Sequence, residues 1–148
     1  MATPLPGNRT RTSDIFTVTT FTPTWNFTVG TGATNEGWYA QIGELVHWGV
    51  RVQLGTSPTS SGTTSVLLDL PVDAWTGGGN GLQAVLGTFN YRDASGPSFY
   101  AGSANVFASA GTQACFILGS STTRLSPTNP VAFAVDDVIA VGGTYMAQ

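Results

Sequence analysis

The chain has 148 residues, of which 41% are hydrophobic and only 9% are charged, whereas about 25% of a typical soluble domain is charged. A coiled coil or other long-helix protein is excluded, because such proteins are rich in Ala, Glu, Lys and Leu and lysine is absent here. The formal net charge of −3 repels phosphate, so we expect no nucleic-acid partner.

The first 13 residues differ from the rest of the chain. They contain Pro4, Pro6, Arg9 and Arg11 and show no apolar period. Two arginines give this segment a charge of +2, whereas three arginines and eight acidic residues give residues 14–148 a charge of −5. A terminal segment of this composition is ordered only when something holds it. We therefore predict an extended arm at residues 1–13 that docks on another protein or on a neighbouring subunit, followed by one β-sandwich domain at 14–148. The alternative is that the arm lies on its own domain.

The first strands are predicted by β-branched and aromatic residues. Residues 15–21 form such a run. Pro23 interrupts it, because proline cannot donate a hydrogen bond to a neighbouring strand. A strand pattern resumes at residues 25–29 and ends at the glycines that follow.

The clearest pattern is a hairpin with strands at residues 37–42 and 45–54. Gly43 and Glu44 form a two-residue connection with glycine first, as a type II′ turn prefers. Alternation in the second strand predicts one buried face and one lightly covered face. The buried face carries Val46, Trp48, Val50, Val52 and Leu54, and the opposite face carries Leu45, His47, Gly49, Arg51 and Gln53.

The rest of the chain continues as short strands joined by loops rich in Gly, Ser, Pro and Asp. Further strands are predicted at residues 63–70, 82–91, 98–107, 113–118, 131–135 and 138–146. No segment has a helical period. We predict an all-β fold, an antiparallel β-sandwich of jelly-roll type with eight or nine strands.

Residues that carry chemistry are few and scattered. His47 is the only histidine and Cys115 the only cysteine, so neither a catalytic triad nor a zinc site is supported. Cys115 lies in an apolar strand pattern and is predicted to be a small buried side chain. Asp136 and Asp137 are interpreted as a tight turn, with a weak calcium site as the alternative. We predict no enzyme activity, no cofactor and no metal.

A candidate contact with a sugar lies in a glycine-rich loop. Trp75 is placed there, and an exposed indole can stack on the face of a sugar ring. Tyr91, Arg92 and Tyr100 lie near the end of a later hairpin and are candidates to join it. The alternative is that Trp75 folds back and caps the sandwich. The other tryptophans are assigned to the core or to subunit contacts.

The low charge of the strand faces favours an assembly component over a freely diffusing enzyme. Depletion of charge is typical of the buried part of protein interfaces. The candidate subunit interface is the lightly covered face of the second hairpin strand, with Leu45, His47, Arg51 and Gln53. We expect no membrane-spanning segment, because no apolar stretch is long enough, and no secretory signal, because residues 1–14 contain no apolar run.

Several segments resemble a module of bacteriophage tail and fibre proteins. They are Phe21–Trp25, Val29–Gly32, Gly37–Trp48, Leu68–Val72, Tyr91–Gly96 and Val135–Tyr145. The resemblance covers residues 21–146. It implies a β-sandwich at the end of a virion fibre or minor tail protein, which forms a homotrimer and contacts the host surface. It implies no catalytic residues.

The resemblance leads us to expect a virion protein that is assembled in the host cytoplasm. Our first hypothesis is a tail, fibre-tip or spike module for host attachment, which docks on a tail, baseplate or capsid protein through residues 1–13 and binds a host surface glycan. A capsid decoration protein is the second hypothesis, and a free carbohydrate-binding module is the third. A glycan hydrolase is disfavoured, because the eight acidic residues form no cluster in the sequence.

Overall fold

The computed structural model describes residues 17–59, 65–76, 84–107, 111–119 and 123–148. Its eight strands are β1 (Val18–Phe21), β2 (Thr34–Ile42), β3 (Leu45–Gln53), β4 (Leu67–Asp69), β5 (Val85–Asp93), β6 (Ser98–Phe107), β7 (Gln113–Leu118) and β8 (Val138–Met146). These ranges contain no helix, and therefore none that could cross a membrane. The predicted all-β antiparallel class is confirmed. The predicted arm, with Pro4, Pro6, Arg9 and Arg11, lies outside the described residues.

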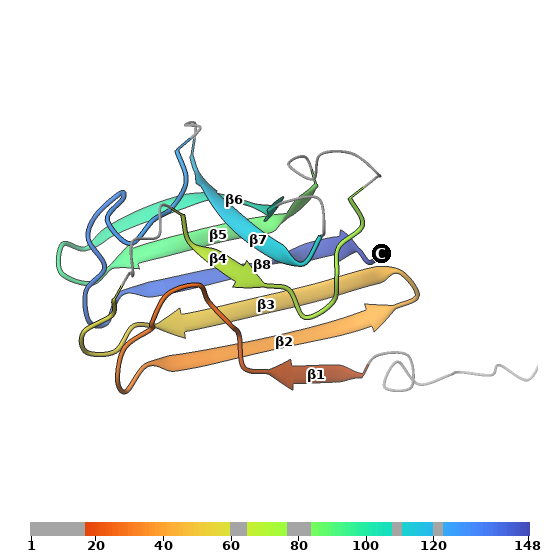
Figure 1. Ribbon diagram of the computed structural model, residues 1–148, viewed down its shortest axis with the longest axis horizontal. Coiled ribbons are helices and arrows are strands. Elements are labelled where there is room, and N and C mark those ends of the chain that lie inside the picture. Colours follow the sequence, from red (N-terminus) through yellow and green to blue (C-terminus); the bar gives the residue numbers. More distant parts are fainter. Residues whose placement is uncertain (1–16, 60–64, 77–83, 108–110, 120–122) are drawn as a thin grey trace, which may run out of the picture.

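The strands form one antiparallel sheet in the order β1-β2-β3-β8-β5-β6-β7-β4. The sheet curls, so that β7 and β4 lie across the face of β8 and β3 (Figure 1). The segment after β1 then meets β4, where the Asn26 N–H donates to the Leu67 carbonyl at 3.1 Å. The sandwich-like fold is thus a half-barrel, whose two walls belong to one continuous sheet.

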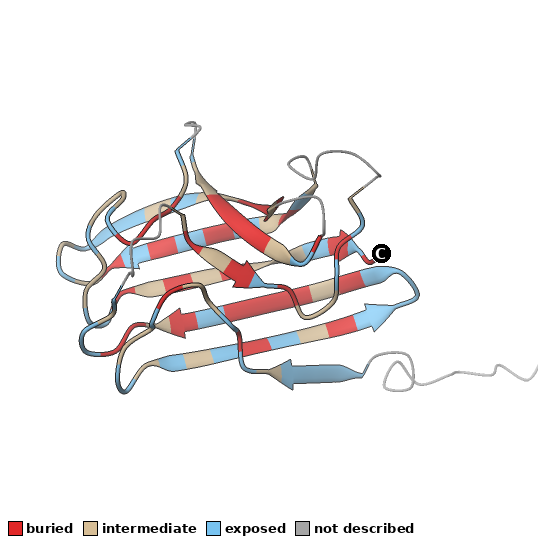
Figure 2. Cartoon of the chain, in the orientation of Figure 1, coloured by how far each residue is buried: buried red, intermediate tan, exposed pale blue. Residues whose placement is uncertain are grey.

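The β2–β3 hairpin confirms the prediction from alternation. Gly43 has a φ of 57°, whereas Glu44 does not have a positive φ. A type II′ turn requires this combination. The turn sets the register, which places Trp38 opposite Gly49. The side chains of β3 that alternation predicted to be buried are buried: Val46 has 0% exposure and Leu54 has 1%. Figure 2 colours the buried residues of β3 and of the other strands red. We call the side of the sheet that carries the buried side chains of β3 the inner face and the opposite side the outer face.

The core fills the space between the two walls. Phe116 on β7 packs against Phe89 on β5, with ring centroids 5.2 Å apart. The Trp48 indole N–H donates to the Leu86 carbonyl at 3.0 Å, which satisfies the polar atom of a buried ring. The largest fully buried side chains come from most strands and from adjoining loops: Trp48, Tyr91, Phe89, Phe116, Leu54, Leu68, Leu86, Leu125, Ile139, Val46, Val52 and Val66.

Two predicted strands are wrong. Residues 131–135 form a loop, in which Phe133 packs on Phe27 and Tyr91 with ring centroids 5.3 and 5.5 Å away. This apolar run covers the end of the core and pairs with no strand. Residues 25–29 make only isolated bridges, from Trp25 to Leu68 and from Thr28 to Thr59.

A buried carboxylate ties the loop before β8 to β5. Asp137 has 0% exposure, and its carboxylate accepts hydrogen bonds from the Tyr91 hydroxyl at 2.6 Å and from the Ala94 and Ala134 N–H groups at 2.9 and 2.8 Å. Burial, followed by the bond to Asp137, raises the pKa of Tyr91 above its ordinary value. The neighbouring Asp136 is exposed and accepts from the Gln53 amide at 2.9 Å. The pair forms a turn, as predicted, and its two carboxylates point to different environments.

Candidate functional site

The outer face carries most of the exposed large apolar side chains in the described part of the chain. Six of these nine side chains lie on the wall formed by β1, β2, β3 and β8 and by the segment beside β8: Val18, Trp38, Ile42, Leu45, Met146 and Trp75. An exposed apolar surface on a folded domain indicates a contact with another molecule. This wall is therefore the candidate functional surface.

Four of the six side chains form one row across the end of the wall. The strand registers place Ile42 opposite Leu45 and Leu45 opposite Met146. The Trp75 N–H donates to the Met146 carbonyl at 2.8 Å, next to a bridge between Ala74 and Ala147, so Trp75 continues the row. The exposures are 37%, 37%, 45% and 59% from Ile42 to Trp75. We call Ile42, Leu45, Met146 and Trp75 the apolar row.

The predicted subunit-interface residues all lie on this outer face. Leu45 belongs to the apolar row, and the His47 Nδ1 atom lies 2.8 Å from the Thr144 hydroxyl on β8. Farther along β3, the Arg51 guanidinium donates to the Gln53 side-chain oxygen at 3.3 Å. The structure confirms that these four residues share one face of β3, and the strand registers add residues of β2 and β8 to that face.

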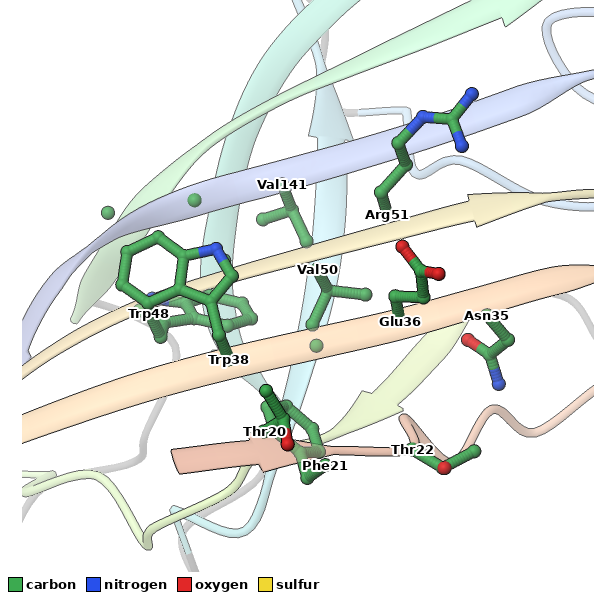
Figure 3. A pocket seen from close by; sticks show the side chains of 14 residues that line it. Thr20, Phe21, Thr22, Asn35, Glu36, Trp38, Trp48, Val50, Arg51 and Val141 are labelled. Carbon is green, nitrogen blue, oxygen red and sulfur yellow. The ribbon is translucent and has the colours of Figure 1, made fainter. Parts of the chain in front are cut away.

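A groove of about 950 Å³ lies farther along the same wall, around Trp38. Figure 3 shows it from the outer side, with the Trp38 indole turned broadside to the viewer. The ring rests on β3, because a Cβ atom on Gly49 would lie 2.7 Å from the indole Nε1. Gly142 on β8 pairs with Gly49, so two adjacent strands have no side chain at this point. We call the site of Glu36, Trp38, Gly49, Arg51 and Gly142 the Trp38 groove.

Two opposite charges border the Trp38 groove. Glu36 and Arg51 are register partners on β2 and β3, but their charged groups do not form an ion pair. Both side chains are exposed. Among the described residues the Glu36 carboxylate has no hydrogen-bond donor. The Arg51 guanidinium donates to Gln53 but keeps further N–H groups, so both charged groups can bond to a ligand.

The four predicted sugar contacts do not form one site. Tyr91 is fully buried on the inner face and stacks on Tyr100 at 5.8 Å, so the prediction of Tyr91 as a surface contact is wrong. Arg92 is exposed on the outer face at the same end of β5. Trp75 is exposed, as predicted, but lies beside Met146, whereas Tyr91 pairs with Ile139. Ile139 and Met146 are seven positions apart on β8, a distance of roughly 23 Å.

The described residues offer no arrangement for metal binding. No group of three or more His, Cys, Asp or Glu side chains in these ranges is placed to hold an ion. Cys115 is buried, as predicted, and burial raises the pKa of its thiol, which keeps the sulfur protonated. Asp69 accepts from the Gln113 amide at 2.8 Å and lies at the end of β4.

Comparison of the chain with protein-family profiles, with curated proteins and with solved structures finds no match. The candidate sites therefore rest on the geometry described above.

Sequence reasoning did not single out Trp38, although a signal for it exists. A two-residue turn at Gly43 and Glu44 fixes the register of the hairpin and places Trp38 opposite Gly49. Alternation in β3 places Gly49 on the lightly covered face. Together the two observations predict an indole that lies on an outer strand surface without an opposing side chain.

Proposed function

We propose that the chain is a structural protein of a bacteriophage virion, a surface module of the tail, fibre-tip or spike type for host attachment. The resemblance of residues 21–146 to phage tail and fibre modules supports the class of protein. The low charge of the chain, 9% of its residues, supports an assembly role. The observation that carries the proposal is the apolar row, which exposes four large apolar side chains side by side.

The proposed occupant of the apolar row is a second copy of the chain. The row carries no charge, so two copies can bury it against each other without desolvating an ion. The resemblance implies a closed trimer, in which the rows of the three copies meet at the threefold axis. His47, which bonds to Thr144, lies next along β3 and forms the polar rim of this contact.

Changing Leu45 to Asp tests the association. We expect the wild-type chain to have a mass near three times its 15.3 kDa, and the Leu45→Asp variant to be monomeric, because each contact would bury an unpaired carboxylate. Size-exclusion chromatography with light scattering measures both masses. Val135→Asp is the matched control, because Val135 is 49% exposed and lies outside the apolar row. A monomeric wild type, or a Leu45→Asp variant with wild-type mass, would contradict the proposed association.

Deleting residues 1–13 tests the attachment to the particle. The deletion removes Arg9 and Arg11, the two cations of the predicted arm. We expect the shortened chain to keep its oligomeric mass and to be absent from purified phage particles, measured by quantitative mass spectrometry. The control is the double variant Arg9→Gln and Arg11→Gln, which keeps the length of the arm and should lower incorporation only in part.

Cross-linking from the arm in intact particles distinguishes the two virion hypotheses. A tail or baseplate partner supports attachment, and a capsid-shell partner favours decoration. Undiminished incorporation of the shortened chain would refute docking through the arm. Glycan binding by a chain that never enters particles would favour a free carbohydrate-binding module.

A further inference from the structure

The Trp38 groove combines an aromatic platform with an open floor. The indole lies on β3 because Gly49 leaves room for it, since a Cβ there would come within 3.0 Å of three indole atoms. The ring is 45% exposed, and Figure 3 shows its broad face turned to the viewer. Gly142 keeps the floor beyond the ring free of side chains. The result is a flat apolar surface beside a depression.

Polar groups from three strands border this platform. Glu36 precedes Trp38 by two residues on β2, and Arg51 follows Gly49 by two residues on β3, so both lie on the outer face roughly 7 Å along the strands from the ring. Thr20 on β1 pairs with Trp38 and adds a hydroxyl. The groove therefore offers an anionic acceptor, a cationic donor and a hydroxyl around one aromatic face.

From this arrangement we infer that the Trp38 groove binds a pyranose ring of a neutral surface glycan. One face of a pyranose carries C–H groups, and this face stacks on the indole, whose amphipathic ring suits such a contact. The ring hydroxyls accept from the Arg51 guanidinium and donate to the Glu36 carboxylate. The inference rests on the proposed host attachment for its biological setting, but its residues are separate from the apolar row.

The charged pair favours a sugar over an apolar protein partner. A large apolar surface laid on the Trp38 groove would remove water from Glu36 and Arg51 without replacing their hydrogen bonds, which is costly. Sugar hydroxyls both donate and accept, so they satisfy the two groups. An acidic sugar is disfavoured, because its carboxylate would meet Glu36 and a chain with a net charge of −3.

The groove and the apolar row are separate surfaces on one wall. Trp38 and Ile42 are four positions apart on β2, a distance of roughly 13 Å. A contact between copies that is centred on the row at the β2–β3 turn leaves the groove at the middle of β2. Each copy in an assembly would then present its own sugar site, and weak single sites would gain avidity.

Titration with simple sugars, followed by ¹H–¹⁵N NMR of the full chain, tests the inference. The probes are the methyl pyranosides of glucose, galactose, mannose and N-acetylglucosamine. We expect at least one of them to shift the Trp38 indole N–H signal and the amide signals of Gly49 and Gly142 in a saturable way. No saturable shift with any of the four, or a shift centred on Trp75, would overturn the inference.

Substitutions assign the binding to the groove. We expect Trp38→Ala to weaken binding at least about tenfold through loss of the stacking surface, and Glu36→Gln to weaken it about fivefold, because a neutral acceptor is weaker than a charged one. Trp38→Phe keeps a smaller ring and should fall between wild type and Trp38→Ala. Phe99→Ala is the matched control, since Phe99 is an exposed aromatic residue outside the groove. The dispersion of the amide signals verifies that each variant folds.

The outcomes separate this inference from the proposed association. A monomeric Leu45→Asp variant that still binds the sugar through Trp38 supports the groove independently of assembly. Wild-type binding by Trp38→Ala overturns the groove, whatever the oligomeric mass of the chain.

Discussion

The Asp137→Ala variant is expected to lose about 4 kcal/mol of unfolding free energy at neutral pH. The substitution removes the acceptor of three hydrogen bonds, from the Tyr91 hydroxyl and from the N–H groups of Ala94 and Ala134. Asp137 is fully buried, and Tyr91 is buried beside it. These donors would lose their protein partner where water has little access, so each would retain most of its desolvation cost.

The neighbouring carboxylate provides the control. Asp136 is exposed and has a φ of 68°, a conformation that asparagine tolerates. Asp136→Asn should therefore change the unfolding free energy by less than about 0.5 kcal/mol. Urea unfolding followed by tryptophan fluorescence measures both variants under the same conditions. Equal losses for the two substitutions would contradict the assignment of Asp137 as the buried acceptor.

A second variant isolates one of the three bonds. Tyr91→Phe removes the hydroxyl that donates to Asp137 at 2.6 Å but keeps the ring that stacks on Tyr100. A loss of about 1–2 kcal/mol is expected, because the carboxylate keeps its two backbone donors. If Tyr91→Phe lost more unfolding free energy than Asp137→Ala, the hydroxyl of Tyr91 would stabilise the fold mainly through contacts other than its bond to Asp137.

Local sequence patterns predicted those parts of the fold that depend on neighbours in the chain. Alternation in β3 identified its buried face, and the glycine at position 43 identified the hairpin turn. Residues 98–107 and 113–118 were predicted with the bounds of β6 and β7. In each case the period of two and the turn residues lie within the element itself, so no distant contact is needed to read them.

Contacts between distant residues decided what the sequence could not predict. The apolar run at 131–135 has the composition of a strand, but Phe133 is held by Phe27, more than 100 positions earlier in the chain. The insertion of β8 between β3 and β5 is equally non-local. Asp136 and Asp137 look alike in the sequence, and bonds from Tyr91 and Ala94, 46 and 43 residues away, distinguish Asp137.

The candidate sites show the same division between local and distant information. Alternation alone placed Leu45, His47, Arg51 and Gln53 on the outer face of β3. The row to which Leu45 belongs also includes Met146 and Trp75, and these join it only through pairing with β8. Tyr91 was selected for its position near a hairpin end, although the phase of β5 turns it into the core.

Gly102→Ala is expected to lower the unfolding free energy by about 3 kcal/mol, because β6 has no room for a side chain at this position. A Cβ there would lie 1.9 Å from the Ile117 carbonyl oxygen and 2.7 Å from the Phe89 ring. Gly102 pairs with Phe89 on one side and with Leu118 on the other, so the sheet is fixed around it. The Ile117 carbonyl belongs to the backbone of β7, and moving it would break the ladder between β6 and β7.

Gly96→Ala separates this steric effect from the general effect of replacing glycine. Gly96 lies in the turn before β6, where a Cβ would make an ordinary contact of 3.5 Å with the Asp93 carboxylate. Its substitution should change stability by less than about 0.5 kcal/mol. Hydrogen exchange supplies a local readout, because Gly102→Ala should accelerate exchange of the β6 and β7 amides beyond that of β2 and β3. Uniform acceleration across all strands would indicate global destabilisation without the local break at Ile117 that the steric argument requires.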